Sequence, residues 1–224
     1  MEIPLLSWKA ITAELKPIEI VAAITSLLCV YLTVKNNIWN WFWGLIGSVL
    51  YGYIFFRISH IYANAGLQLL YFVPMQFVGW YVWMKGNPNK NDALPISALT
   101  NRERIVWWVI TALLSVALYY GLPPLVTAFR LPPPQLSPMD CFTTGLSISA
   151  QFLQTYKKFE NWVLWIVADL IYTFYIFPQL KMPVTTLLYA VFTVLATTGA
   201  ISWYRQMQKE SHPEVGEETI GVDA

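Results

Sequence analysis

Polar and aromatic side chains recur at helical spacing within one apolar stretch, residues 63–84. In the segment QFVGWYVW, Gln76, Trp80 and Trp83 fall within about 60° of one another on a helix, and Gln68 comes earlier in the same stretch. Indole faces attract flat cationic rings, and amides hydrogen-bond sugar hydroxyls or ring amides with defined geometry. This combination favours contact with a flat, hydroxylated small molecule. Trp83 lies near the end of the stretch, where an anchor at the membrane surface is an equally good interpretation.

A second set of polar side chains follows after residue 138. The helix that begins there carries one polar face, made of Asp140, Thr144, Ser147, Gln151, Gln154 and Lys158. The next apolar stretch places four more on one stripe: Asn161, Trp165, Asp169 and Tyr172. Amide and charged groups inside a membrane span are costly and usually face the interior of the bundle. Asp169 is the one carboxylate well inside a span, so it could pair with a partner, carry a proton or face a cationic ligand.

Structural interpretations of these side chains stay open. The two glutamines could bond only across helices. Asn40 and Asn161 each precede an apolar helix and could cap its first turn. Trp41 and Trp162 lie near the ends of apolar stretches, which favours interfacial anchors over ligand contact.

The residue inventory argues against an enzyme and against a metal or nucleotide cofactor. His60 and His212 are isolated from other ligand-type residues, and no phosphate-binding loop of the form G-x-x-x-x-G-K-[ST] occurs. Cys29 and Cys141 both fall inside apolar stretches, where we expect small apolar residues rather than a disulfide. The net charge of +1 gives no sign of a nucleic-acid partner.

The elements that must position these residues are membrane helices. Of the 224 residues, 56% are hydrophobic and 12% are charged, against about a quarter charged in soluble domains. Seven apolar stretches approach the length that crosses a bilayer, namely 18–34, 41–57, 63–84, 104–122, 139–156, 161–178 and 184–204. We therefore expect an all-α membrane protein with seven transmembrane helices. Residues 1–17 read as a segment that could form an interfacial helix, and 206–224 as a disordered acidic tail.

An internal repeat organises the spans. Shifting the sequence by 121 residues aligns Pro17 with Pro138, Asn40 with Asn161 and several further pairs without a gap. The predicted layout is a three-helix repeat (18–84), a linking helix with its loops (85–137) and a second three-helix repeat (138–205). Both copies cross in the same direction, so they are parallel repeats, an arrangement that encloses a site near the midplane of the membrane. The small residues Gly44, Ser48 and Gly52 favour close packing in the first copy.

The basic residues predict the orientation. Nine of the 14 lysines and arginines lie in the loops after spans one, three and five and in the C-terminal segment. The positive-inside rule then places the C-terminus in the cytoplasm and the N-terminus outside.

The sequences NIWNWFWGLIGSVLYGYIFF, ANAGLQLLYFVPMQFVGWYVW and NWVLWIVADLIYTFYIF resemble the PnuC family of bacterial vitamin transporters, over about residues 18–205. The resemblance implies a three-one-three (3+1+3) helical fold related to the SWEET sugar transporters, in the bacterial inner membrane. It also implies uptake of a vitamin precursor, usually nicotinamide riboside, by facilitated diffusion, with the substrate trapped by a cytoplasmic riboside kinase. Thiamine and riboflavin are carried by other branches of the family and remain alternatives.

We therefore expect a nicotinamide riboside transporter in the lipid bilayer, with the ligand between the repeats. Expected ring contacts are Trp80 and Trp165, and expected hydrogen-bonding partners are Gln76, Gln151, Gln154 and Asn161. Gln68 and Tyr172 are secondary, Asp169 would orient an amide or balance a pyridinium charge, and Trp83 and Asn40 would lie farther out or at a gate. Proton-coupled uptake is the rival mechanism, and a non-transporting membrane receptor is the rival class. The sequence leaves the oligomeric state open, including a homotrimer.

Overall fold

Seven helical rods, each one continuous run of helix, make up most of the described part of the protein. The computed structural model describes residues 17–58, 62–86, 94–130, 137–176, 178 and 183–211. In chain order, the rods are α2 (Pro17–Val34), α3 with η1 (Asn40–Tyr53, Ile54–Ile58), α4 with η2 and α5 (Tyr62–Gly66, Leu67–Phe72, Val73–Lys85), α6 (Asn101–Ala128), α7 (Pro138–Thr155), α8 with η3 (Asn161–Ile171, Tyr172–Ile176) and α10 (Pro183–Ser211). Each predicted stretch thus corresponds to one rod. The expected interfacial helix before residue 17 lies outside the described residues, and α10 runs to Ser211, past the predicted boundary at 205.

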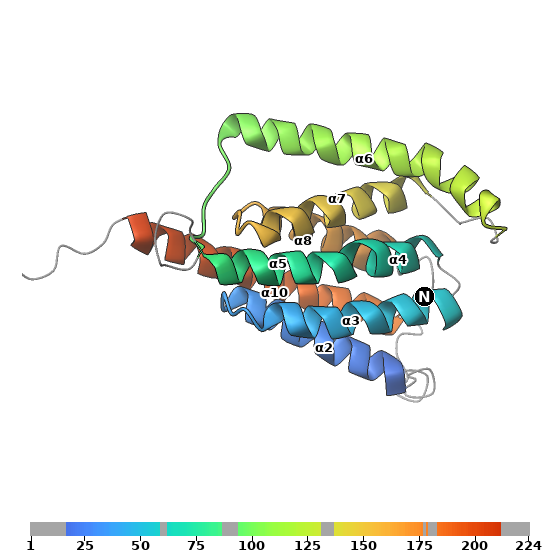
Figure 1. Ribbon diagram of the computed structural model, residues 1–224, viewed down its shortest axis with the longest axis horizontal. Helices are drawn as coiled ribbons and strands as arrows, with labels where there is room; N and C mark the ends of the chain where they lie inside the picture. Colours follow the sequence, from blue (N-terminus) through green and yellow to red (C-terminus); the bar gives the residue numbers. More distant parts are fainter. Residues whose placement is uncertain are drawn as a thin grey trace, which may run out of the picture.

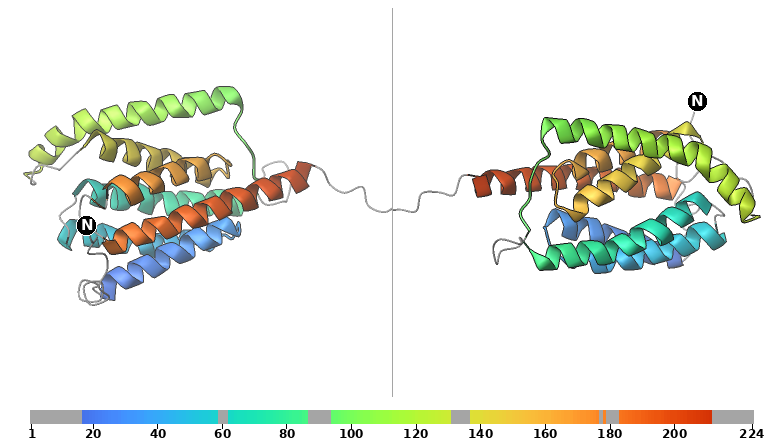
Figure 2. Two further views of the ribbon diagram at one scale, coloured as in Figure 1. Left: turned by 180° about the vertical axis from the view of Figure 1, so that it is seen from behind. Right: turned by 45° about the horizontal axis from the view of Figure 1, so that its top comes forward.

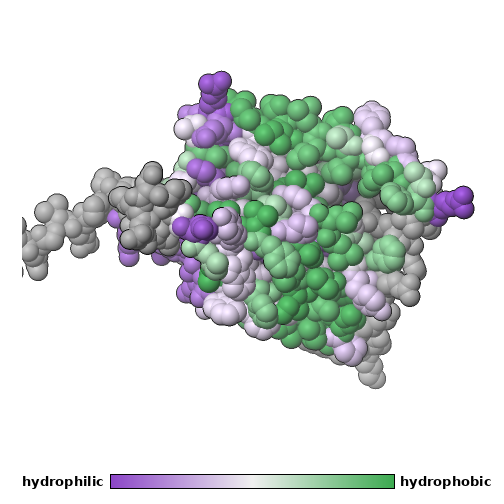
Figure 3. Space-filling model, viewed as in Figure 1, coloured by the Kyte–Doolittle hydropathy of each residue, from purple (hydrophilic) through white to green (hydrophobic). Residues whose placement is uncertain are grey.

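Three rods are by themselves long and apolar enough to cross a membrane: Pro17–Val34, Asn101–Ala128 and Thr186–Lys209. Three of the others contain a stretch of wider π-helix, η1, η2 or η3. Such stretches shift the side chains that follow relative to a regular α-helix and often occur at functional sites. The space-filling view shows apolar residues over most of one face and hydrophilic residues gathered toward its ends, as a membrane protein requires (Figure 3).

Local sequence signals fix the starts of α6 and α7. The Thr100 hydroxyl accepts a hydrogen bond from the Glu103 N–H, and the Glu103 carboxylate accepts one from the Thr100 N–H, which forms a capping box at the start of α6. Ser137 and Asp140 form the same box at the start of α7. Asp140, which was expected on the polar face of this helix, therefore caps the first turn of α7.

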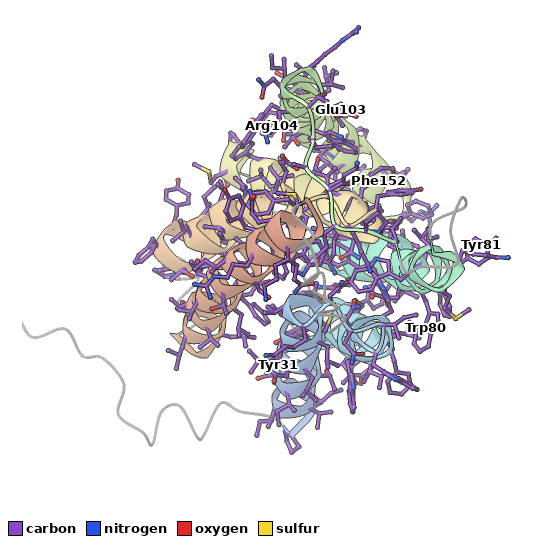
Figure 4. The ribbon with its side chains drawn as sticks, turned by 90° about the vertical axis from the view of Figure 1, so that its left-hand side faces the viewer. Tyr31, Trp80, Tyr81, Glu103, Arg104 and Phe152 are labelled. Atoms are coloured by element: carbon purple, nitrogen blue, oxygen red, sulfur yellow. The ribbon has the colours of Figure 1, made fainter. Side chains whose placement is uncertain are left out.

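Six of the rods form a closed ring. Contacts run from α2 to α3, to α5, to α7, to α8, to α10 and back to α2, so the α5–α7 seam and the α2–α10 seam join the two predicted repeats. The ring is seen along its helices in Figure 4 and from the side in Figures 1 and 2. The linking helix α6 lies outside it and packs mainly against α7, where Thr111 Oγ1 and Ser149 Oγ share a buried hydrogen bond of 2.7 Å.

Equivalent turns in the two predicted repeats have the same geometry. Asn36 and Lys157, 121 residues apart, both adopt positive φ, at 54° and 49°. The backbone hydrogen bonds around them also match: Asn37 N to Leu32 O and Lys158 N to Leu153 O, both at 2.9 Å. These are the bonds that close a helix C-terminus when the following residue is left-handed. The aligned sequences therefore fold alike at the turns 35–39 and 156–160, and we call the end of the ring that holds these turns the tryptophan end.

Candidate binding site inside the helix ring

The amide of Gln154 on α7 is tied to the indole of Trp165 on α8. Trp165 Nε1 donates a hydrogen bond of 3.1 Å to Gln154 Oε1, and Gln154 is buried. The Trp165 ring also contacts Phe72 of η2, with ring centroids 6.2 Å apart at 54°. Because Phe72 belongs to the first predicted repeat and Trp165 to the second, this contact spans the space between them.

Gln151 lies nearly one turn before Gln154 on α7 and is 5% exposed. Its Nε2 group has no hydrogen-bond partner among the described residues. Buried polar groups in proteins almost always have a partner, because an unsatisfied one costs about 1–3 kcal/mol. Gln151 therefore presents a donor that water or a ligand would satisfy.

Gln76 on α5 is the counterpart from the first predicted repeat. It is 6% exposed, and its Oε1 atom likewise has no partner in the part of the chain that the structure describes. A Cβ atom added at Gly44 would lie 2.5 Å from this oxygen and 3.0 Å from Cys29 Sγ. Gly44 was predicted as a packing position; the structure shows that its missing side chain makes room for the Gln76 amide.

Asp169 and Tyr172 continue the stripe of Trp165 toward the η3 end of α8. Both are buried, and the Tyr172 ring packs against Tyr189 of α10 with centroids 4.8 Å apart. Gln68 lies in η2 and is half-buried. The stripe thus runs from the middle of the ring to the end opposite the tryptophan end.

Asn40 and Asn161 close the equivalent turns rather than cap a helix. Asn40 Nδ2 donates to Asn37 O at 2.7 Å, and Asn161 Nδ2 donates to Lys158 O at 2.6 Å. Neither α3 nor α8 has a side-chain capping bond at its first turn, so the cap interpretation is wrong. Both Oδ1 atoms are buried without a partner within the described ranges.

The tryptophans that sequence reasoning placed at the membrane surface are buried. Trp41, Trp83, Trp162 and Trp203, the tryptophan cluster, are 0%, 5%, 1% and 0% exposed. Trp41 lies over Gly79, where an added Cβ would be 2.3 Å from its ring, and Trp162 lies over Gly199 at 2.5 Å. The anchor interpretation of Trp41, Trp83 and Trp162 is therefore wrong. For Trp41 and Trp162, the missing signal was the glycine one helix away.

Trp80 packs against the edge of this cluster but is itself only half-buried. Its Nε1 donates to Met84 Sδ at 3.0 Å, and its ring meets Trp39 edge-on at 5.5 Å. Both of these partners are largely exposed, and Figure 4 places Trp80 between α3 and α5. The shared helical face of Gln76, Trp80 and Trp83 thus divides among three environments.

Segment 94–100, which we call the strap, was predicted only as part of a connecting loop. Ser97 forms an isolated parallel bridge with the 156–160 turn: its N–H donates to Lys157 O and its carbonyl accepts from Phe159 N–H. The Leu99 N–H donates to Glu160 Oε2 at 2.9 Å, and Glu160 Oε1 pairs with Arg104 Nε at 2.9 Å. Ile96 packs with the tryptophan cluster and Leu99 with the α7–α8 core. The spacing of the apolar residues in LPISAL was the available signal.

A buried cation was also missed. Lys157 is 3% exposed, and its Nζ lies 4.4 Å from the centroid of the Trp83 ring, a cation–π geometry. The orientation prediction counted this lysine among the basic residues of the loop after span five. Its burial follows from the left-handed turn and from the strap that covers it.

A cavity of about 190 Å³ opens between α6, α7 and α8, outside the ring. Its walls are mostly apolar, with the Arg104–Glu160 ion pair among the lining residues. It contains neither Gln151 nor Trp165 and is therefore separate from the buried amides.

The known proteins that are similar to this chain all point to one family. The family described as nicotinamide mononucleotide transporter matches residues 16–205. The nicotinamide riboside transporter PnuC of Escherichia coli (strain K12) is 31% identical over 209 residues, covering 85% of this chain and 86% of its own length. The protein of the same name from Neisseria mucosa is 29% identical, covering 85% and 73%.

A solved structure agrees. The crystal structure of the vitamin B3 transporter PnuC superposes with a TM-score of 0.68 at 26% sequence identity, covering 84% of this chain and 81% of that one. The chain therefore belongs to the PnuC family of membrane transporters.

Proposed function

We propose that the protein carries nicotinamide riboside across the bacterial inner membrane by facilitated diffusion. The ligand binds inside the ring, between two parallel three-helix repeats in a 3+1+3, SWEET-like layout, and a cytoplasmic riboside kinase traps it. The observation that carries the proposal is the pair of buried, unpartnered amide atoms, Gln151 Nε2 and Gln76 Oε1, on opposite repeats of a PnuC-family chain. A donor and an acceptor facing a polar ligand from two sides suit a molecule with hydroxyls and an amide.

Charge favours the riboside over the mononucleotide. Among the described residues, the buried charged side chains are Asp169 and Lys157. Lys157 is engaged with Trp83 at the tryptophan end, which leaves Asp169 as the charge along the stripe. Burying a phosphate without a cation is costly, whereas a pyridinium ring is balanced by a carboxylate.

In this site, Trp165 rather than Trp80 is the ring contact, because Trp165 is joined to Gln154 and faces the other repeat through Phe72. Gln151, Gln154 and Gln76 are the hydrogen-bonding partners. Asn161 and Asn40 offer acceptors nearer the tryptophan end. Tyr172, Asp169 and Gln68 lie toward the opposite end.

The proposed orientation puts the tryptophan end in the cytoplasm and the N-terminus outside. The basic residues Lys35, Lys85, Arg104, Lys158 and Arg205 lie at or near that end. A C-terminal reporter active only in the cytoplasm tests this orientation, and activity of a reporter that functions only outside contradicts it.

Binding by purified protein tests the substrate. Nicotinamide riboside, thiamine and riboflavin are compared by thermal shift and calorimetry, with nicotinamide mononucleotide as the charge control. Stabilisation by the riboside and not by the mononucleotide is expected. Stabilisation by thiamine alone would move the assignment to that branch of the family, since thiamine is also a flat cation.

A further inference from the structure

Trp83 and Trp203 hold equivalent places in the two repeats. Each lies near the end of the third rod of its repeat and meets an indole of the second rod edge-on. The ring centroids are 5.2 Å apart for Trp83 with Trp41 and 5.4 Å for Trp203 with Trp162, both pairs at 87°. The Trp83 and Trp203 rings themselves meet at 6.3 Å.

Each of these indoles bonds to the opposite repeat. Trp83 Nε1 donates to the backbone carbonyl of Thr155 on α7 at 3.1 Å, and Trp203 Nε1 donates to that of Thr33 on α2 at 3.0 Å. Thr155 is the last residue of α7 and Thr33 lies next to the last residue of α2. Carbonyls in the last turn of a helix lack i→i+4 partners, so they are available as acceptors. Thr33 O also accepts from Asn36 N–H at 2.9 Å, and its second lone pair takes the indole bond.

The two bonds cross the two seams of the ring. One joins α5 to α7 and the other joins α10 to α2, and all four residues are buried at the tryptophan end. We propose that Trp83 and Trp203 form a reciprocal latch between the repeats, whose two indole–carbonyl bonds must break for the tryptophan end to open. The proposal rests on the transport function, because a carrier with its site inside the ring must separate the seams at one end.

The latch is not symmetric. Lys157 places its ammonium over Trp83, whereas the equivalent residue in the first repeat is Asn36, which is neutral. The strap residue Ile96 packs on the same cluster. The cation and the strap thus add contacts at the Trp83 side of the latch.

The test measures opening directly with buried thiols. Cys29 and Cys141 are first replaced by Ala, and uptake by this background must match the native chain. T155C then places a thiol in the α5–α7 seam, and T33C places one in the α2–α10 seam. Both side chains are buried, and both substitutions keep the backbone carbonyl that accepts the indole bond. Protein in lipid nanodiscs is treated with a maleimide, and the labelling rate reports how often the seam opens.

Removing one indole N–H should open its own seam more often. W83F should raise labelling of T155C, and W203F that of T33C, by roughly two- to tenfold, the population change expected for losing one neutral hydrogen bond. W108F, on the exposed face of α6, is the matched control and should change neither rate. Unchanged rates in both latch variants would overturn the proposal.

A thiol at T111C, buried between α6 and α7 outside the seams, reports general loosening. If W83F or W203F raises labelling of T111C as well, labelling cannot distinguish seam opening from general loosening, and a cross-link tests the latch instead. Val34 and Ser202 are neighbours across the α2–α10 seam, where Ser202 Oγ donates to the Val34 backbone carbonyl at 3.3 Å, so V34C and S202C introduce two thiols close enough for a linker. Joined by a short thiol-specific linker, this pair should stop uptake but preserve riboside binding, and reducing the linker should restore uptake. T111C/S149C joined in the same way should leave uptake intact, and uptake through the linked V34C/S202C protein would overturn the latch.

Labelling needs no ligand, so it also separates the two proposals. Failure of riboside to bind the native chain contradicts the proposed substrate, while seam labelling independently supports or contradicts the latch.

Discussion

Trp165 Nε1 donates to Gln154 Oε1 at 3.1 Å, so the indole that contacts Phe72 of the first predicted repeat also holds an amide of the candidate site. The indole thus fixes which way the Gln154 carboxamide points. Ring contact and hydrogen bonding to the ligand are coupled through this pair.

W165F keeps an aromatic ring and removes the N–H donor. The freed Gln154 amide would turn, so affinity for nicotinamide riboside should fall roughly three- to tenfold, the usual effect of one hydrogen bond. Calorimetry measures this, with W80F as the matched control because Trp80 bonds to Met84 on the α3–α5 side. Equal losses in the two variants would show that Trp165 has no special place in the site.

Q151L should separate stability from binding. Leucine has a similar volume and removes a buried donor that has no partner among the described residues, so the empty protein should be as stable as the native one or more so. Riboside affinity should fall by more than about tenfold, because the ligand loses its donor. Thermal denaturation and calorimetry give the two readings. A destabilised Q151L protein with unchanged affinity would mean that Gln151 serves the fold alone.

Gly79 and Gly199 should tolerate no side chain. A Cβ at either position would lie within 2.5 Å of the buried ring of Trp41 or Trp162, so G79A and G199A should each destabilise the protein by roughly 1–3 kcal/mol or prevent folding. G121A is the control, because nothing lies within 4 Å of an added Cβ there and alanine favours helix. The thermal midpoint should fall for the first two and hold or rise for the third.

Glu160 should matter more than its ion-pair partner. R104A removes a half-exposed charge, 47% exposed, and should cost less than about 1 kcal/mol. E160A also leaves the strap N–H of Leu99 without its acceptor and should cost about 1–3 kcal/mol. Unfolding of both variants and of the double variant measures the difference. Equal losses would indicate that the strap bond contributes nothing beyond the pair.

The sequence predicted the seven rods of the described residues because apolar length is a local property of the chain. The gapless spacing predicted that residues 121 apart would fold alike, and the structure confirms this at two turns. These are the left-handed turns at Asn36 and Lys157. The buried glutamines were also predictable, since an amide inside an apolar stretch must face the interior.

The positions of the tryptophans were not predictable in the same way. Trp41 and Trp162 occur near helix starts, as anchors do, and only Gly79 and Gly199 on other rods reveal that their rings turn inward. The sequence places Lys157 in a loop, and only the structure shows that the strap covers this turn and that the lysine is buried. Such facts depend on contacts between distant segments, which one sequence without its fold does not contain.

Uptake of labelled nicotinamide riboside into liposomes that contain the purified protein tests the central claim most directly. Without any ion gradient, the internal concentration should rise to the external one and stop there, and it should rise far more slowly with Q151L. A pH gradient should leave the plateau unchanged. No uptake above that of empty liposomes, or accumulation beyond the external concentration driven by the pH gradient, would contradict facilitated diffusion of this substrate.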